Sequence, residues 1–446
     1  MGGSMILGQT SGSRRAYRAA AALTLMALFL GACGDDSTTT KSTGTGSTAT
    51  SGSGASGGTA AKATGATATS GSGATGGAAV KATGDPVSIG FINQENDPAG
   101  DYSDVHAGVD AAVGRINNEL GGLDGRPIKL EVCTTKAASG GDVCANQMVA
   151  AKVPVVEGGY VFNSGPMLPI LKSAALPYVG GFALTAADFP ADDNHAYIGG
   201  STVSSYGALG NYVNSLGVKR VSIIYIDVPA GKAGADALKA SVEKSGATVK
   251  MIPFPSGAAD VTPFVTAAGE GSPGVIAILV AAPACGNVMG AIPTLGLKAK
   301  VVTAPACASK EVLDLAGSGA TGVQYYSSYK AYNTVGDAEV ATYQKAMKDY
   351  TSKSISARSV EGYAVTMAVY DILKKSGGAA ATTQRVAETL RTAKDVNFVL
   401  GVPYTCSPPP VPAVPAVCQD GIRMWEVGAD RASVSVANGK IFRTAG

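Results

Sequence analysis

Acid–base chemistry in this 446-residue chain would have to use one of two histidines or a pair of carboxylates. A Ser-His-Asp triad around His195 would need a serine on a G-x-S-x-G turn between a strand and a helix, and the sequence offers none there. We interpret His195 as a solvated loop histidine, while His106 falls near the start of an expected helix. Glycoside hydrolysis would need two carboxylates facing one cleft, for which Glu95 and Asp227 are the available pair. The sequence establishes neither a Ser-His-Asp triad nor a pair of carboxylates facing one cleft. We therefore expect that the protein is not an enzyme and has no catalytic residues.

Six cysteines follow Cys33, and an even number in an exported chain favours disulfides. Six cysteines allow fifteen pairings, but each has a near neighbour, at separations of 11, 22 and 12 residues. The predicted disulfides are the sequential ones: Cys133–Cys144, Cys285–Cys307 and Cys406–Cys418. Metal binding is the alternative, but no C-x-x-C spacing occurs and no histidine lies nearby in sequence. We therefore expect no metal site and no cofactor.

The first 33 residues have the pattern of an export signal. Arg14 and Arg15 precede a short apolar run over residues 19–30, which is shorter than the roughly twenty residues that span a bilayer. The run ends in Leu-Gly-Ala-Cys, which looks like a bacterial lipobox, in which Cys33 receives a diacylglycerol. A plain signal peptide with a chance cysteine is the alternative. We expect lipidation at Cys33 and attachment to the outer face of the cell membrane.

Residues 34–84 contain Gly, Ser, Thr and Ala with few large apolar side chains, which predicts a disordered tether. A seventeen-residue segment, 49–65, recurs at 68–84 with three differences. As a flexible coil these 51 residues would span about 40 Å. Both copies contain G-x-G-x-x-G, at 52–57 and 71–76, but neither lies between a strand and a helix. We therefore expect no nucleotide binding.

The chain from Asp85 onward is long enough for two domains. Net charge is +2 and 15% of all residues are charged, so nothing in the composition suggests nucleic acid as a partner. Short β-branched runs alternate with helical patterns; a helix over 104–120, for example, is stopped by Gly121-Gly122. The expected strands of the first half are 87–92, 128–133, 153–159 and 176–182, and its helices are 104–120, 141–152 and 165–175.

The alternation begins again after Leu216. Strands are expected at 219–226, 248–254, 274–280 and 299–304, and helices at 234–246, 261–270 and 285–296. Two long helical patterns follow, at 338–350 and 359–377, and then a strand-like tail whose Asn438-Gly439 suits a tight turn. Two successive β-α-β series predict an α/β fold of two doubly wound open-sheet lobes. Ligands of such sheets bind beyond the carboxyl ends of the strands, here in the cleft between lobes that close by a hinge.

Over about residues 87–446 the sequence resembles the type I periplasmic-binding-protein family, more narrowly the branched-chain amino-acid type of solute-binding lipoprotein of ABC importers. The resemblance rests on the order and spacing of several motifs: VSIGFIN, AAVGRINNELGGLDGRPIKLEVC, LPYVGG, VKRVSIIYIDVPAGKAGADALKASVEKSGATV and VANGK. It implies a multi-strand hinge between the lobes, an export signal, a lipid anchor and ligand transfer to a permease. Approximate boundaries are 87–203 with 330–420 for lobe 1 and 204–329 with 421–446 for lobe 2.

The resemblance also implies which loops contact the ligand. These loops follow the strands of both lobes, and one further residue lies near the hinge. The ligand-binding residues implied are Gln94, Glu95, Asn96, Tyr102, Tyr160, Phe162, Asn163, Ser164, Phe182, Ala183, Leu184, Asp227, Pro229, Ala230, Pro283, Pro305 and Tyr329.

The chain departs from the family at the second-lobe loops. Amino-acid-binding members place an acid there for the ligand's ammonium group, whereas this chain has Ala-Pro-Ala at 282–284 and at 304–306. A buried ammonium without a countercharge costs several kcal/mol. Glu95, Asp97 or Asp227 could replace that acid, or each could order its own loop. No Arg or Lys falls in the loops, so a carboxylate would depend on backbone N–H groups.

These features predict a binding protein for a neutral or mostly apolar small molecule, with a branched-chain amino acid as an alternative ligand. The expected partners are the ligand, ABC importer permease subunits and the membrane through the N-terminal lipid; a monomer is expected. The alternative function is a ligand sensor of the same fold that signals to a membrane partner.

Overall fold

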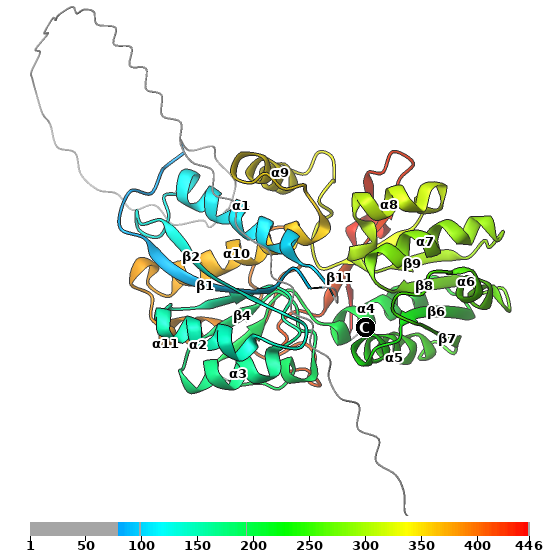
Figure 1. The fold of residues 1–446 in the computed structure, drawn as a ribbon, viewed down its shortest axis with the longest axis horizontal. Helices are drawn as coiled ribbons and strands as arrows, with labels where there is room; N and C mark the ends of the chain where they lie inside the picture. Colours follow the sequence, from blue (N-terminus) through cyan, green and yellow to red (C-terminus); the bar gives the residue numbers. More distant parts are fainter. Residues whose placement is uncertain (1–78, 98–99, 193, 445–446) are drawn as a thin grey trace, which may run out of the picture. The chain divides into compact units, whose positions relative to one another are not determined.

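The computed structural model describes residues 79–97, 100–192 and 194–444 (Figure 1). The expected export signal, Cys33 and most of the expected tether, including both G-x-G-x-x-G copies, lie outside the described residues. Within the described part of the chain, one parallel and one mainly parallel β-sheet are each covered by helices on both faces.

The first sheet has the strand order β2-β1-β3-β4-β5 and is parallel throughout. Its central strands are almost wholly buried, as is typical of a sheet covered on both faces. Its strands are β1 (Val87–Gln94), β2 (Ile128–Thr135), β3 (Val156–Gly158), β4 (Tyr178–Gly180) and β5 (His195–Tyr197).

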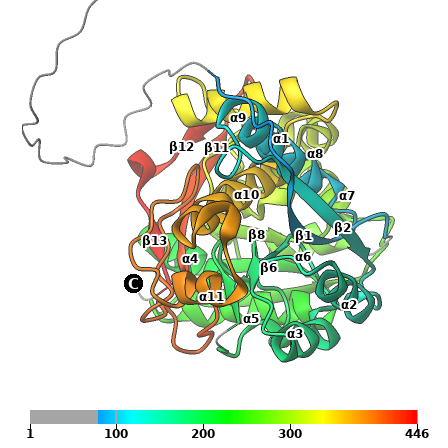
Figure 2. The same ribbon diagram turned by 90° about the vertical axis from the view of Figure 1, so that its left-hand side faces the viewer.

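One face of this sheet is covered by the helix that directly follows β1 and by helices from much later in the chain; the other face is covered by the helices that follow β2 and β3 (Figures 1 and 2). The first group contains α1 (Ser103–Glu119), α9 (Ala338–Tyr350), α10 (Ala357–Lys375) and α11 (Thr383–Arg391), and the second contains α2 (Gly141–Ala151) and α3 (Ser164–Ser173). Helix α1 ends where Gly121 and Gly122 adopt φ values of 78° and 66°, as the glycine pair predicts.

The second sheet has the order β7-β6-β8-β9-β10-β11-β12, in which β11 and β12 are antiparallel additions to a parallel core. Strand β13 also pairs with β11. The strands are β6 (Arg220–Ile226), β7 (Thr248–Phe254), β8 (Val275–Leu279), β9 (Lys300–Thr303), β10 (Gln324–Ser327), β11 (Gly421–Val427), β12 (Ser433–Ser435) and β13 (Phe442–Arg443). Asn438 and Gly439 both have positive φ, so the predicted tight turn is present.

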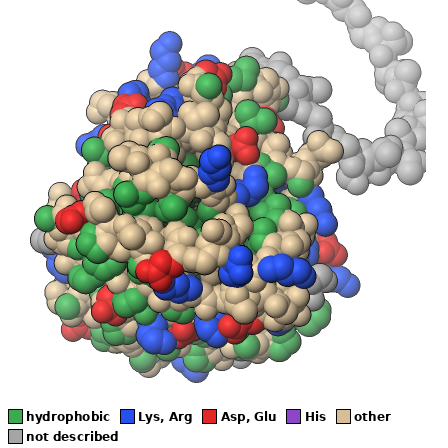
Figure 3. Space-filling view, turned by 90° about the vertical axis from the view of Figure 1, so that its right-hand side faces the viewer, with side chains coloured by type: hydrophobic (Ala, Val, Ile, Leu, Met, Phe, Trp, Pro, Cys, Tyr) green, Lys and Arg blue, Asp and Glu red, His purple; other side chains and the backbone are tan. Residues whose placement is uncertain are grey.

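Helices α4 and α5 cover one face of the second sheet, and α6, α7 and α8 cover the other. Their bounds are α4 (Thr202–Ser215), α5 (Pro229–Glu243), α6 (Thr262–Gly269), α7 (Ala282–Thr294) and α8 (Lys310–Ala316). On the face shown in Figure 3, Lys and Arg side chains are interspersed with Asp, Glu and hydrophobic side chains, so no area of one charge sign dominates it.

The chain crosses between the two sheets three times, after β5, after β10 and before β11. Backbone hydrogen bonds join these crossings: Cys418 N–H donates to the Tyr197 carbonyl (2.9 Å), and Val402 N–H donates to the Ser328 carbonyl (2.9 Å). The fold is therefore two doubly wound lobes joined by a hinge of several strands.

The structure joins the six cysteines after Cys33 in sequential pairs. Cys133–Cys144 links β2 to α2, and Cys285–Cys307 links α7 to the turn after β9. Cys406–Cys418 closes the proline-rich segment that precedes β11. Each disulfide therefore links two segments that lie near the end of a strand or near a crossing between the sheets.

The end of the expected tether corrects one prediction. Disorder was predicted as far as Gly84, but Val80 N–H donates to the Glu119 carbonyl (3.1 Å) and Ala82 N–H to the Asn117 carbonyl (2.8 Å). Ala82 is also buried. Composition alone missed this because small residues that lack a core of their own can still pair with a backbone supplied by α1.

Candidate ligand-binding site

Asn93 ties together two loops at the carboxyl end of the first sheet. Its side-chain amide donates to the Tyr102 carbonyl (2.9 Å), and its side-chain oxygen accepts from the Tyr160 N–H (3.0 Å). The residue is fully buried at the end of β1. The side-chain amide of Asn93 therefore fixes the backbone positions from which the Tyr102 and Tyr160 side chains extend.

Four aromatic rings form a row at this edge of the sheet. Tyr102 and Tyr160 stack with centroids 4.5 Å apart and ring planes 2° from parallel. Phe162 lies 5.8 Å from Tyr102, and Phe182 lies 5.9 Å from Tyr160. All four keep some exposure. The structure thus brings together four of the predicted ligand residues, from three separate loops, into one apolar surface.

Arg358 adds a positive charge to this row. Its guanidinium carbon lies 4.4 Å from the Tyr102 centroid and 4.5 Å from the Tyr160 centroid, within the range of a cation–π contact. Arg358 is in the first turn of α10, whose N-cap is Ser356. The side chain is partly buried, and its Nη1 is enclosed without a hydrogen-bond partner among the described residues.

Glycines on α1 and α10 explain why Arg358 reaches Tyr102. A Cβ on Gly108 would lie 2.0 Å from the Ser359 carbonyl oxygen, and one on Gly362 would lie 2.0 Å from the Val105 carbonyl oxygen. The two helices can approach this closely only where both lack a side chain. Their first turns, and with them Tyr102 and Arg358, therefore lie side by side.

Two carboxyl groups lie near the guanidinium, and both are engaged elsewhere. Glu361 accepts a hydrogen bond from the Tyr160 hydroxyl (3.0 Å), and Asp104 accepts one from the Ser356 hydroxyl (2.8 Å). Burial raises the pKa of Glu361 to about 7, although Arg358 and the Tyr160 hydrogen bond act in the opposite direction. Burial also raises the pKa of Asp104, against the effect of Arg358. Glu361 is thus partly protonated near neutral pH.

Glu95, one of the acids considered for an ammonium group, is paired within its own lobe. Its Oε1 lies 2.9 Å from Nδ1 of His106 and accepts a hydrogen bond from Asn93 (3.1 Å). Burial raises the pKa of Glu95, but the hydrogen bonds from His106 and Asn93 outweigh it and lower the pKa. The hydrogen bond to Glu95 raises the pKa of His106. This geometry favours the loop-ordering role for Glu95.

The other predicted residues of lobe 1 lie at the same edge with mixed exposure. Asn163 accepts from the Gly141 N–H (2.9 Å), and Ser164 and Thr185 share a hydrogen bond of 3.0 Å between their hydroxyls. These contacts order the loops after β3 and β4. The remaining predicted residues here are Gln94 and Ala183, which are buried, Leu184, which is half-buried, and Asn96, which is exposed.

The predicted residues of lobe 2 are less closely grouped. Asp227 is exposed between β6 and α5, Pro229 and Ala230 are exposed at the start of α5, Pro283 is exposed at the start of α7, and Pro305 is half-buried after β9. They share the carboxyl edge of the second sheet, and no described contact joins them to the aromatic row.

Tyrosines that the sequence did not single out approach the row from lobe 2. Tyr326 of β10 is buried, and burial raises its pKa; Tyr206 and Tyr160 raise this pKa further, and Arg358 lowers it. It meets Tyr206 of α4 edge to face at 5.7 Å. Tyr329, by contrast, is only 4% exposed and packs edge to face against Phe398 in the core of lobe 1. We therefore leave Tyr329 out of the candidate site.

Arg358 corrects the expectation that no side-chain cation serves the ligand loops. The expectation considered only residues that directly follow strands, and Arg358 comes from the start of a helix about two hundred residues after Tyr160 in sequence. The available signal was an Arg and a Glu, 358 and 361, on the first turn of an otherwise apolar helical pattern. Charged residues on a buried helix need partners. Arg358 and Glu361 therefore indicated a functional role at this end of the helix.

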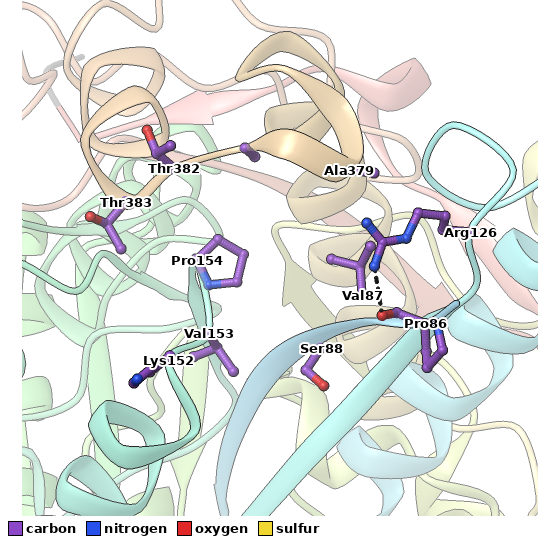
Figure 4. Close-up of a pocket in the computed structure, with 11 residues that line it drawn as sticks. Pro86, Val87, Ser88, Arg126, Lys152, Val153, Pro154, Ala379, Thr382 and Thr383 are labelled. Carbon is purple, nitrogen blue, oxygen red and sulfur yellow. Dashed lines mark hydrogen bonds between the residues drawn. The ribbon is translucent and has the colours of Figure 1, made fainter. Parts of the chain in front are cut away.

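A separate depression lies at the opposite edge of the first sheet (Figure 4). It is lined by residues that include Pro86, Arg126, Lys152 and Thr383, and Arg126 donates a hydrogen bond to the Pro86 carbonyl (3.2 Å). These residues lie beside the amino ends of β1 and β3, and none belongs to the aromatic row. It is therefore a different surface feature.

The described residues contain no cluster of three or more His, Cys, Asp or Glu side chains that could hold a metal ion. None of their helices is both long enough and apolar enough to cross a bilayer.

Comparison with known proteins gives one family match and many structural matches. The family model described as periplasmic binding protein matches residues 86–407. A search of curated protein sequences finds no match. A leucine-binding protein of Thermotoga maritima is similar in structure, with a TM-score of 0.63 and 16% identity, covering 80% of this chain and 99% of that one.

Two further structures show the same similarity of fold. An ABC transporter solute-binding protein of Rhodopseudomonas palustris HaA2, solved with p-hydroxybenzoic acid, has a TM-score of 0.66 and 16% identity, covering 81% of this chain and 98% of that one. An ABC transporter substrate-binding protein of Sphaerobacter thermophilus gives the same four values, 0.66, 16%, 81% and 98%.

Proposed function

The chain belongs to the periplasmic binding protein family, and from that premise we propose that it captures a small, mostly apolar solute between its lobes and delivers it to the permease of an ABC importer. It is a solute-binding protein of the ABC transporter type and not an enzyme, as the family implies. The observation that carries the proposal is the row of Tyr102, Tyr160, Phe162 and Phe182 at the carboxyl edge of the lobe 1 sheet. Ligands of open α/β sheets bind at this edge.

We place the ligand contacts on the predicted loop residues of lobe 1, together with Asp227, Pro229, Ala230, Pro283 and Pro305 of lobe 2. The solute first meets the aromatic row, and lobe 2 then closes over it. Closure on binding requires that the ligand prefer the closed state, so contacts from both lobes are needed. Solved relatives that bind leucine and p-hydroxybenzoic acid support a ligand of this size.

The family is extracytoplasmic, and we propose that this chain is held at the outer face of the membrane by lipid on Cys33. Residues 34–79 then form the tether, because backbone pairing with α1 begins at Val80. We retain the approximate lobe boundaries given above, except that Tyr329 is placed with lobe 1, and we propose a monomer.

Native mass spectrometry of the protein purified from its own host tests the proposal. We expect one small molecule per chain, released unchanged on unfolding, and a matching rise in melting temperature when that compound is added back. Chemical conversion of the compound during incubation would contradict a binding-only function.

A further inference from the structure

Arg358 is the charged group in the candidate site that the fold does not explain. The described residues contain no hydrogen-bond acceptor for its guanidinium, and no ion pair joins it to any of their carboxylates. A guanidinium has five N–H donors and stays charged at every working pH. Leaving such a group unpaired in a partly buried place is costly, so a partner from outside the fold is expected.

The neighbouring acids do not supply that partner. Asp104 accepts hydrogen bonds from the Ser356 hydroxyl and from the Val105 N–H. Glu361 faces the Tyr160 hydroxyl instead, and its other oxygen has no partner among the described residues. Because the pKa of Glu361 is raised to about 7, this carboxyl neutralises the guanidinium only in part near neutral pH.

The surroundings of Arg358 restrict what an external partner can be. The guanidinium carbon lies 4.4 Å from the Tyr102 centroid and 4.5 Å from the Tyr160 centroid, and these rings stack on each other 4.5 Å apart, so the cation lies beside the stacked pair. Two further rings, Phe162 and Phe182, extend the row beyond these two at 5.8 and 5.9 Å. Arg358 also stands in the first turn of a 19-residue helix, whose amino end favours negative charge.

We propose that Arg358 is the specificity-determining residue of the site and that the solute is an aromatic carboxylate. In this arrangement the carboxylate accepts two parallel hydrogen bonds from the guanidinium, and the aromatic ring stacks on the row that ends in Phe162 and Phe182. The inference rests on the proposed function, since it names the chemical class of the solute that the lobes enclose. It revises the expectation of a neutral ligand and keeps the mostly apolar contact surface.

Binding of benzoate and of its neutral isostere benzamide to the full chain tests the proposal by calorimetry. Wild-type protein should bind benzoate at least about 30-fold more tightly than benzamide, because one charged pair is present only with benzoate. Arg358→Gln should abolish that preference, because it should weaken benzoate binding far more than benzamide binding. Arg358→Lys should retain part of it, because lysine keeps the charge and loses the planar fork.

Arg385→Gln is the matched control, because Arg385 is exposed on α11 of the same lobe. It should leave both affinities unchanged. Thermal unfolding without ligand shows whether Arg358→Gln is folded, and if it is not, Arg358→Lys and the wild-type benzoate preference carry the test.

Equal affinity of the wild-type protein for benzoate and benzamide would overturn the role of Arg358, as would unchanged benzoate binding by Arg358→Gln. If benzamide or leucine binds while benzoate does not, the inference fails and the solute-binding function stands. If native mass spectrometry finds no small molecule and none of the three compounds binds, the proposed function fails as well.

Discussion

The buried carboxyl group of Glu157 predicts that the protein loses stability as pH rises towards 8. The residue lies in β3, is 1% exposed and accepts one hydrogen bond, from the Thr366 hydroxyl of α10 (2.8 Å). Its second oxygen has no partner among the described residues. Its titratable neighbours, Tyr178 of β4 and Tyr329 after β10, carry no positive charge that would favour the carboxylate. Burial therefore raises the pKa of Glu157 to about 8.

The sign of the effect follows from proton binding. Between the unfolded pKa of 4.5 and the folded pKa of about 8, the folded chain holds a proton on Glu157 that the unfolded chain has lost. The stability contributed by this group is therefore complete below pH 4.5 and is lost as pH rises to 8. A shift of this size corresponds to about 4 to 5 kcal/mol at most, and water entering the site would reduce it.

Glu157→Gln removes the titration while keeping shape and size, so we expect the variant to lose less stability than wild type between pH 5 and pH 8.5. The difference should be roughly 2 to 4 kcal/mol in the free energy of unfolding, measured with urea at the two pH values. Glu388→Gln, on the exposed surface of α11, is the control and should shift both measurements equally. Identical pH dependence in Glu157→Gln and wild type would refute the reasoning.

Three further predictions concern the anchor, the rings and the helix contact. Cys33→Ser should move the protein from the membrane fraction to the soluble fraction, and continued membrane association would exclude the lipid anchor. Phe162→Ala and Phe182→Ala should each weaken ligand binding about tenfold in calorimetry without lowering the melting temperature by more than a few degrees; unchanged affinity would remove the ring from the site. Gly362→Ala places a Cβ 2.0 Å from the Val105 carbonyl oxygen. It should therefore lower the free energy of unfolding in urea by about 1 to 3 kcal/mol and weaken ligand binding. Wild-type stability and affinity would show that the two helices adapt to the added methyl group.

The sequence predicted most of the fold because each strand and helix carries its own local pattern. The glycine pair after α1, the β-branched runs of β1 and β6 and the Asn438-Gly439 turn all depend on neighbours in the chain. Strands β3 and β4 are shorter than their apolar runs suggest, because pairing rather than hydrophobicity decides where a strand ends. Strand β5 was not predicted, and its His195 is buried rather than in a solvated loop.

The candidate site could be predicted only in part for a related reason. Loops after strands share one edge of a parallel sheet, and the resemblance to binding proteins named Tyr102, Tyr160, Phe162 and Phe182 within such loops. Arg358 joins them through a helix from the far end of the chain, and that contact depends on two glycines whose pairing no local pattern reveals.

The contact between α1 and α10 therefore links the fold to the chemistry of the site. One helix begins beside Tyr102 and the other begins with Arg358, and the glycine crossing at Gly108 and Gly362 sets the distance between these first turns. A side chain at either glycine would separate the guanidinium from the ring before it altered either sheet. Ligand selectivity should accordingly be more sensitive to changes at this crossing than to changes of similar size in the core of lobe 2, where no helix carries a residue of the aromatic row.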